Sequence, residues 1–359
     1  PICKNDLQER GWDRPDFIFV CGDAYVDHPS FGHAVISRLL ESEGYRVGII
    51  SQPDWRTTDD FVKLGTPRLG VMVSSGVLDS MVNNYTAAKK RRREDAYSPG
   101  GKTGRRPDRA MIVYCNKIRE AFGNIPLIIG GLEASLRRFA HYDYWQDEVR
   151  SSILIDSGAD LLVYGNGEKA VLEIARLLDK GVPVASLKSI SGTAVAISEE
   201  ELPVKIKKEL AEGGNQVIML PSKEEVTKNR RHYARAFMVQ YREQNPYTGK
   251  VLIQPHNNRL VLQNKPLEPM TEKELDKIYA LPYQRKWHPV YDKLGGIPAL
   301  REVEFSITSH RGCYGGCSFC AIGYHQGRII QARSSQSILE EARIMTEQRE
   351  FKGYIHDVG

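Results

Sequence analysis

Short apolar runs that end at glycine or aspartate recur along the first half of the chain, and segments with helical spacing separate them. The first run covers residues 17–21, and apolar residues at helical spacing follow it as far as residue 40. Further strands are expected at 46–51, 69–74, 125–129 and 160–164, and further helices at 108–122 and from 168 to about 178. Strands and helices that alternate in this way indicate a parallel sheet with helices on both faces. We therefore expect an α/β fold with a doubly wound parallel sheet.

The organisation is weaker between residues 186 and 300. Short strands are expected at 194–197 and 251–254, and helices at 223–243 and 272–279. The Pro and Gly residues and the irregular spacing between these elements are typical of insertions. We interpret this part as a connecting region with insertions between two domains.

A regular pattern returns in the last sixty residues. A strand is expected at 303–308, a helix at 335–349 and another strand at 353–357, which together form one βαβ unit. A single βαβ unit cannot bury its own core. We therefore predict that the chain stops inside a second, catalytic domain. The expected domains are an N-terminal sheet domain at 1–185, the connecting region at 186–300 and the start of a truncated barrel at 301–359.

Composition and charge exclude several classes of protein. Apolar residues make up 41% of the 359 residues and charged residues 26%, which favours a packed core over disorder. The apolar runs are far shorter than the roughly 20 residues that span a bilayer, and the N-terminus lacks the layout of a signal peptide. We predict a cytoplasmic protein that does not bind a membrane.

The net charge of +5 is small for this length and does not indicate nucleic-acid binding. The basic residues are locally concentrated, however, in a run at 89–93 that Lys102, Arg105, Arg106 and Arg109 follow. A solvated loop is the favoured interpretation of this segment. A binding surface for an anionic partner is the alternative.

Three of the six cysteines fall within eight positions. Cys313, Cys317 and Cys320 lie in a segment that also contains Gly312, Gly315 and Gly316. Glycines let the backbone turn tightly, so that thiolates spaced in this way can converge on one metal centre. Three ligands leave one iron of a cubane cluster open, whereas electron-transfer clusters and structural zinc sites use four. Zinc completed by His310 or His325 is the alternative, although the two spaced ligand pairs of the common zinc motifs are absent.

The pattern Cys313-x-x-x-Cys317-x-Phe319-Cys320 resembles the signature of radical S-adenosylmethionine enzymes. The chain as a whole resembles the YgiQ-type group of this superfamily. The segments that carry this resemblance are residues 22–32 (GDAYVDHPSFG), 52–55 (QPDW), 130–135 (GGLEAS) and 310–328 (HRGCYGGCSFCAIGYHQGR). The resemblance implies a cobalamin-binding-like sheet domain followed by the first βαβ unit of a partial TIM barrel.

The resemblance also implies an activity. A [4Fe-4S] cluster on Cys313, Cys317 and Cys320 would bind S-adenosylmethionine and cleave it reductively to a 5′-deoxyadenosyl radical, which abstracts hydrogen from a substrate. The electron would come from a donor such as flavodoxin or ferredoxin. Phe319 would pack beside the adenine, and Gly359 lies where a glycine-rich turn would receive the methionine amino group. The sequence indicates neither the substrate nor a catalytic residue beyond these cofactor ligands.

Two further cofactor hypotheses concern the N-terminal half. Similar domains bind cobalamin with Gly-Gly and Gly-x-Gly-Glu turns, which correspond here to 130–131 and 165–168. The residues around His28 have the wrong spacing for a corrin-ligating histidine, so a sheet without corrin is favoured. A second cluster on Cys3, Cys21 and Cys115, as in methylthiotransferases, lacks that family's surrounding residues. A non-catalytic zinc- or corrin-binding protein is the alternative to the radical enzyme.

Overall fold

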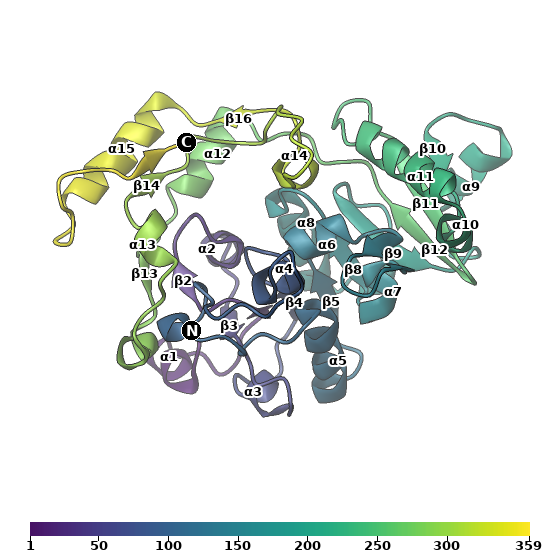
Figure 1. Ribbon diagram of the computed structural model, residues 1–359. Helices are drawn as coiled ribbons and strands as arrows, with labels where there is room; N and C mark the ends of the chain where they lie inside the picture. Colours follow the sequence, from purple (N-terminus) through teal and green to yellow (C-terminus); the bar gives the residue numbers. More distant parts are fainter.

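The computed structural model describes residues 1–359 and is built around one nine-stranded sheet (Figure 1). The strand order is β10-β11-β12-β9-β8-β5-β4-β1-β3. The strands are β1 Phe17–Cys21, β3 Val47–Ser51, β4 Gly70–Ser74, β5 Leu127–Ile129, β8 Leu161–Val163, β9 Thr193–Ile197, β10 Val217–Met219, β11 Val251–His256 and β12 Arg259–Gln263. The strands expected in the first half of the chain are therefore present.

The five strands β3, β1, β4, β5 and β8 run parallel. Numbered along the chain they have the order 2-1-3-4-5, in which the connections change direction between β1 and β4. Ligands of such sheets bind at the carboxyl ends of the strands beside this change of direction.

Helices cover both faces of the parallel part, as expected of a doubly wound sheet. Successive residues of β1 point to opposite faces, so Phe17 and Phe19 pack in one core with α2 and α8, and Ile18 and Val20 pack in the other with α5. All five residues of β1 are buried, which explains the continuous apolar run in the sequence.

Of the covering helices, α8 begins at the predicted residue and α5 begins two residues after its predicted start. They are α2 Gly32–Ser42, α5 Ala110–Phe122 and α8 Glu168–Asp179, with the shorter α1 Lys4–Glu9, α3 Asp59–Val62, α4 Ser80–Asn84, α6 Leu132–Leu136 and α7 Ile153–Ser157. The 3-10 turns are η1 Pro99–Gly101, η2 Val184–Ser186 and η3 Pro289–Leu294. No helix combines the length and apolar character needed to cross a bilayer.

The prediction of a purely parallel sheet is wrong at one end. The strand β9 runs antiparallel to β8, and β12 runs antiparallel to both β9 and β11. The strands β11 and β12 are joined by Asn257 and Asn258, with Asn257 at φ +50°. A two-residue turn of this kind can only connect antiparallel strands. The strands β9–β12 follow residue 185, where a domain boundary was expected. The sheet therefore continues across that position.

The predicted helix at 223–243 is divided in two at Asn229. The side chain of Asn229 accepts a hydrogen bond from Arg231 N at 2.9 Å and caps the second helix. The elements of this region are α9 Val204–Ala211, α10 Lys223–Lys228, α11 Arg230–Arg242 and α12 Glu272–Tyr279.

The C-terminal part contains the expected βαβ unit in reduced form. The strands β14 Ser306–Ile307 and β17 Asp357–Val358 pair in parallel, with α15 Ser335–Thr346 between them in the chain. Residues 300–303 form the helical turn α13 Leu300–Val303 instead of the start of a strand, since Leu300 O accepts a hydrogen bond from Glu304 N. The unit buries only Phe305, Ile307 and Met345 as a small core of its own.

Short antiparallel pairs complete the fold. They are β2 Val26–Asp27 with β13 Lys286–Trp287, β6 His141–Asp143 with β7 Glu148–Arg150, and β15 His310–Arg311 with β16 Gln331–Ala332. The last pair closes a loop of residues 312–330, which we call the cysteine loop. It contains the short helix α14 Ile322–His325, which lies against α6 at the carboxyl edge of the sheet (Figure 1).

Candidate metal centre

The cysteine loop is closed at its base by backbone and side-chain hydrogen bonds. Cys313 N donates to Gly327 O at 3.0 Å, and Gly312 N donates to the side-chain oxygen of Gln326 at 3.1 Å. Gly312 has φ +87°, and a Cβ on it would lie 2.3 Å from Ile329 O. Only glycine fits this turn, which places the first cysteine directly beside the closed base.

Two of the three thiols face the same glycine. A Cβ on Gly315 would lie 3.3 Å from Cys313 Sγ and 3.9 Å from Cys317 Sγ. Cys320 N donates to Cys317 O at 3.1 Å, so the last cysteine is one turn away. Cys317 is exposed, and Cys313 and Cys320 are half-buried. The thiols of Cys313 and Cys317 thus flank a space beside Gly315 at the loop surface.

The spacing of the sulfurs fits a cluster of several irons better than a single ion. The three Sγ atoms do not all lie within 4.8 Å of one another. Tetrahedral zinc with bonds of about 2.3 Å to sulfur would hold its thiolates about 3.8 Å apart. An iron–sulfur cluster attaches each thiolate to a different iron and separates them further. Three thiols on one glycine-rich loop are the donor set that such a cluster requires.

Neither histidine proposed for zinc joins the cysteines. His325 Nδ1 lies 2.9 Å from Ser135 Oγ, and His310 Nδ1 lies 2.9 Å from Ser309 Oγ. Burial lowers the pKa of His325 to about 4, so that this ring is neutral at pH 7. No histidine forms a group with two of these thiols in which all ligand atoms lie within 4.8 Å of one another.

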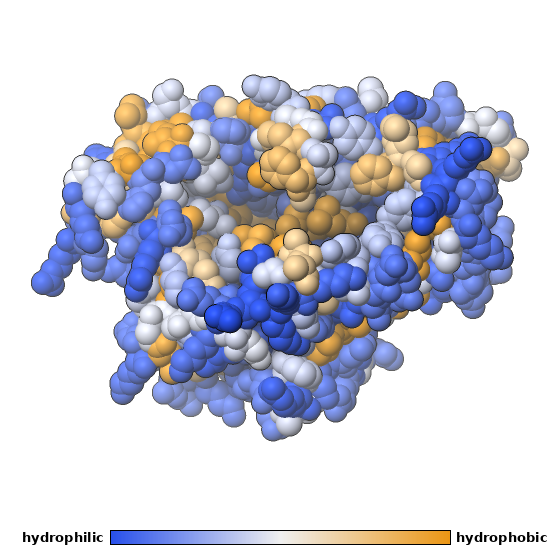
Figure 2. Space-filling view, viewed as in Figure 1, coloured by the Kyte–Doolittle hydropathy of each residue, from blue (hydrophilic) through white to orange (hydrophobic).

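A cavity of about 720 Å³ lies between the cysteine loop and the carboxyl edge of the sheet. Figure 2 shows the hollow on this face, with apolar residues inside it. Its walls on the loop side include Phe319, Cys320 and His325. On the sheet side they include the turns at 130–131 and 165–168, together with Ser74 and Gly76 after β4. The cavity therefore covers the change of direction between β1 and β4, next to one of the three thiols.

The two predicted cofactor-binding residues have different surroundings. Phe319 is 90% exposed as a residue, and it belongs to the wall of the cavity. Gly359 lies beyond β17, where its N donates to Ile307 O at 3.0 Å and its O accepts from Ser309 N at 2.8 Å. Gly359 is not part of the cavity wall. Their roles toward S-adenosylmethionine stay predictions.

His28 is not available as a metal or corrin ligand. It is fully buried, its Nδ1 accepts a hydrogen bond from Ser30 N at 3.1 Å, and its Nε2 lies 2.8 Å from Arg285 Nη1. Burial lowers the pKa of His28 to about 3, and the neighbouring guanidinium contributes in the same direction. His28 lies in the turn between β2 and α2, where its O accepts a hydrogen bond from Phe31 N at 2.9 Å.

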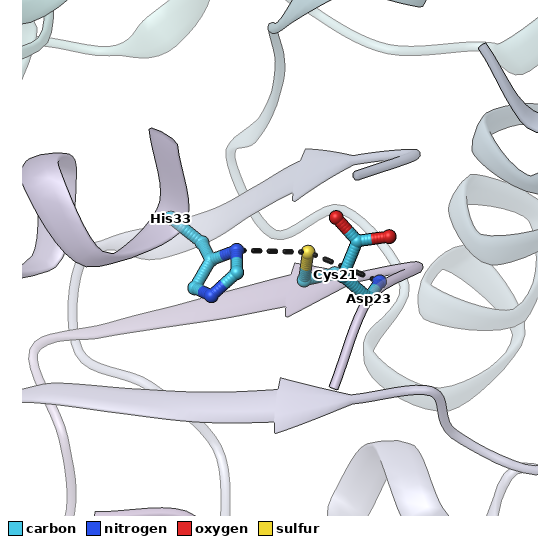
Figure 3. Close-up of side chains that lie close together, drawn as sticks. All are labelled: Cys21, Asp23 and His33. Atoms are coloured by element: carbon cyan, nitrogen blue, oxygen red, sulfur yellow. Dashed lines mark hydrogen bonds between the residues drawn. The ribbon is translucent and has the colours of Figure 1, made fainter. Parts of the chain in front are cut away.

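Three buried side chains meet at the end of β1 (Figure 3). The sequence did not predict this group. Cys21 Sγ, a carboxylate oxygen of Asp23 and a ring nitrogen of His33 lie within 4.8 Å of one another. Val26 N donates to His33 Nε2 at 3.5 Å, so the ring proton is on Nδ1, 3.3 Å from Cys21 Sγ. Asp23 accepts from Arg106 Nη2 at 2.6 Å. These hydrogen bonds use the sulfur, the ring nitrogens and the carboxylate oxygen that would otherwise be free to bind a metal. The three side chains therefore form a buried hydrogen-bond network.

The remaining cysteines do not form a second centre. Cys115 is buried on α5, and burial raises the pKa of its thiol to about 12. Burial also raises the pKa of Cys21. Cys21 packs in the core on one face of the sheet and Cys115 in the core on the other face.

Fold and site together define a class of protein: a doubly wound α/β domain with a three-cysteine loop against its ligand-binding edge. The family model described as "Radical SAM N-terminal" matches residues 1–306. The chain belongs to this family, and SAM here denotes S-adenosylmethionine. The match ends before Cys313, so the cysteine loop lies outside it.

The matches to curated relatives cover the whole chain. A UPF0313 protein of Clostridium botulinum (strain 657) is 58% identical over 359 residues, which are 100% of this chain and 54% of the relative. A UPF0313 protein of Clostridium perfringens is 55% identical over 360 residues, with 100% and 53% covered. The chain thus spans about half the length of the curated relatives it matches.

A solved structure was also matched at low identity. The radical S-adenosylmethionine methyltransferase TsrM of Kitasatospora setae shares 16% identity with this chain at a TM-score of 0.48. The match covers 92% of this chain and 45% of that protein.

Proposed function

We propose that this chain supplies the thiolate ligands and one wall of the cofactor pocket of a radical S-adenosylmethionine enzyme. The observation that carries this proposal is the position of the cysteine loop. In a chain of the Radical SAM N-terminal family, Phe319 and Cys320 line the same cavity as the carboxyl ends of the parallel strands. Ligands of doubly wound sheets bind at that edge.

The chemistry belongs to the cofactors, and the protein provides binding and orientation. A [4Fe-4S] cluster supplies the electron that cleaves S-adenosylmethionine to a 5′-deoxyadenosyl radical. Cys313, Cys317 and Cys320 would hold this cluster, leaving one iron for S-adenosylmethionine. Phe319 would cover the adenine, because an exposed aromatic ring on the cavity wall offers a face for stacking. Gly359 would lie beside the methionine end.

Further parts of the proposal concern partners and domains. A flavodoxin- or ferredoxin-type donor would deliver its electron from the side of Cys317, the exposed thiol of the three. Residues 1–185 would form the sheet domain, with strands contributed from the connecting region 186–300, and residues 301–359 would begin the barrel. The substrate would be bound in the cavity of the complete enzyme.

The test is the metal content after anaerobic reconstitution with iron and sulfide, with zinc measured in parallel. We expect about four irons per chain in the wild type. Cys317→Ala should lose them, whereas Cys3→Ala, the matched control outside the loop, should keep them. His325→Gln should keep the wild-type iron content as well, since its ring contacts Ser135.

Two outcomes would contradict the proposal. Stoichiometric zinc without iron would identify a zinc protein, and iron that survives Cys317→Ala would mean that other groups bind it. Cleavage of S-adenosylmethionine by the full-length protein that contains this chain is the next measurement. Its products, methionine and 5′-deoxyadenosine, are read by mass spectrometry.

A further inference from the structure

A buried ion pair holds the start of the cysteine loop against the N-terminal sheet. Glu168 is the first residue of α8, and its Oε1 accepts a hydrogen bond from Arg311 Nη1. Glu168 is 5% exposed and Arg311 9%. Arg311 ends β15 and stands two positions before Cys313. The ion pair therefore fixes the backbone immediately before the first thiolate.

The guanidinium of Arg311 is fixed on a second side by α12. Arg311 Nε donates to the hydroxyl of Tyr279 at 3.0 Å, and the guanidinium carbon lies 5.2 Å from the centre of the Tyr279 ring. Hydrogen bonds from an arginine to two fixed acceptors define its orientation. The side chain thus has one position relative to the sheet.

The turn before α8 also holds the far end of the loop. Asn166 Nδ2 donates to Gln326 O at 3.4 Å, and the side chain of Gln326 accepts from Gly312 N at 3.1 Å. Both ends of the loop are thus attached to the segment 166–168. This segment precedes Arg311 by more than 140 residues in the sequence.

We infer that Glu168 is a positioning residue for the metal centre and acts through Arg311 on the orientation of Cys313. The inference rests on the proposed function, because it concerns the cluster that the three thiolates would hold. Loss of the Glu168 charge leaves the Arg311 charge buried without its partner, which is strongly unfavourable. The loop must then move to bring the guanidinium to water. Loss of a nearby negative charge also favours the reduced form of a cluster.

The first test uses the metal-free chain and hydrogen exchange of the peptide that contains Gly312 and Cys313. Glu168→Gln should raise the exchange rate of these amides roughly tenfold or more, since their hydrogen bonds depend on the loop position. Glu274→Gln is the matched control. That carboxylate forms an exposed ion pair with Lys169 at 2.9 Å on the same side of the molecule. Unchanged exchange in Glu168→Gln would overturn the inference.

The second test uses the reconstituted chain and measures a property that a purely structural role would not change. Glu168→Gln should raise the midpoint potential of the cluster and alter its EPR spectrum, and Glu168→Asp should restore part of both. An unchanged potential and spectrum at full iron content would overturn the inference. Where Glu168→Gln does not fold, as judged by far-UV circular dichroism, Arg311→Gln breaks the same ion pair from the loop side. Because it removes a positive charge, the midpoint potential should then fall, and an unchanged potential would overturn the inference.

The two proposals fail in different ways. If the wild type binds no iron, the proposed function fails, while hydrogen exchange still reports the attachment of the loop. If the wild type binds about four irons and Glu168→Gln behaves like Glu274→Gln, the inference fails and the proposed function stands.

Discussion

His325 Nδ1 lies 2.9 Å from the hydroxyl oxygen of Ser135, which joins the cysteine loop to the helix that follows the Gly-Gly turn. The same oxygen accepts a hydrogen bond from Gly165 N at 3.1 Å. A hydroxyl can accept two hydrogen bonds and donate one, so Ser135 can satisfy both groups at once. One serine thus connects both glycine turns of the sheet with the loop that carries the thiols.

Replacing Ser135 by alanine should lower the free energy of unfolding by about 1–3 kcal/mol, because Gly165 N–H and His325 Nδ1 lose their partner in a buried place. Urea denaturation measures this effect. Ser42→Ala is the control, since the Ser42 hydroxyl bonds only to Leu39 O in its own helix. A loss in Ser135→Ala no larger than in the control would contradict the role of this contact.

Gly315→Val should reduce the iron bound per chain at least about twofold, since its side chain would occupy the space between Cys313 Sγ and Cys317 Sγ. Gly316→Val should bind as much iron as the wild type, because no atom lies within 4 Å of a Cβ at that position. The iron content after reconstitution decides between them. Equal iron in both variants would mean that the thiols do not converge beside Gly315.

The basic segment after η1 contains a buried arginine next to an exposed one. Arg106 donates from Nη2 to Asp23 at 2.6 Å and from Nε to Gly22 O at 3.0 Å, and its side chain is 0% exposed. Arg106→Met should lower the free energy of unfolding by about 3–5 kcal/mol, because the Asp23 carboxylate loses its partner. Arg105→Met should change it by less than about 0.5 kcal/mol. Thermal and urea unfolding measure the free energy of unfolding of both variants. A similar loss in Arg106→Met and Arg105→Met would mean that the ion pair between Arg106 and Asp23 does not stabilise the fold.

His28 makes the stability depend on pH. Its pKa is about 3 in the folded protein, and an unfolded histidine titrates near about 6.5, so the unfolded state binds more protons between these values. Stability should therefore fall as the pH falls below about 6.5, by about 2 kcal/mol from His28 at pH 5.

His28→Gln keeps a polar side chain beside Arg285 but does not titrate. The slope of the unfolding free energy between pH 7 and pH 5 should accordingly be smaller in this variant than in the wild type. The contributions of other groups cancel in this comparison. Equal slopes would show that His28 is protonated in the folded protein.

The parallel part of the fold could be predicted from the sequence because its strands are buried on both faces and read as apolar runs. Phe17–Cys21 is the clearest case. The antiparallel part was missed, although Asn257 and Asn258 between two apolar segments are a hairpin signal. The connecting region was too irregular for its strands to be assigned to the same sheet.

The sequence predicted only the part of the candidate site whose residues lie close together in the chain. The spacing of Cys313, Cys317 and Cys320 identified the loop. No spacing relates Arg311 to Glu168, or His325 to Ser135, because these contacts depend on the packing of the loop on the sheet. The same holds for His33 and Cys21, which come together only when α2 packs on β1.

The cysteine loop is attached to residues that precede it in the chain and are therefore synthesised before it. Ser135, Asn166 and Glu168 leave the ribosome well before Cys313 does. Because domains generally fold as units from the N-terminus, the surface that receives the loop can be in place before the first thiol is exposed. Under the proposed function, metal insertion would then follow the folding of the sheet, which would serve as its template.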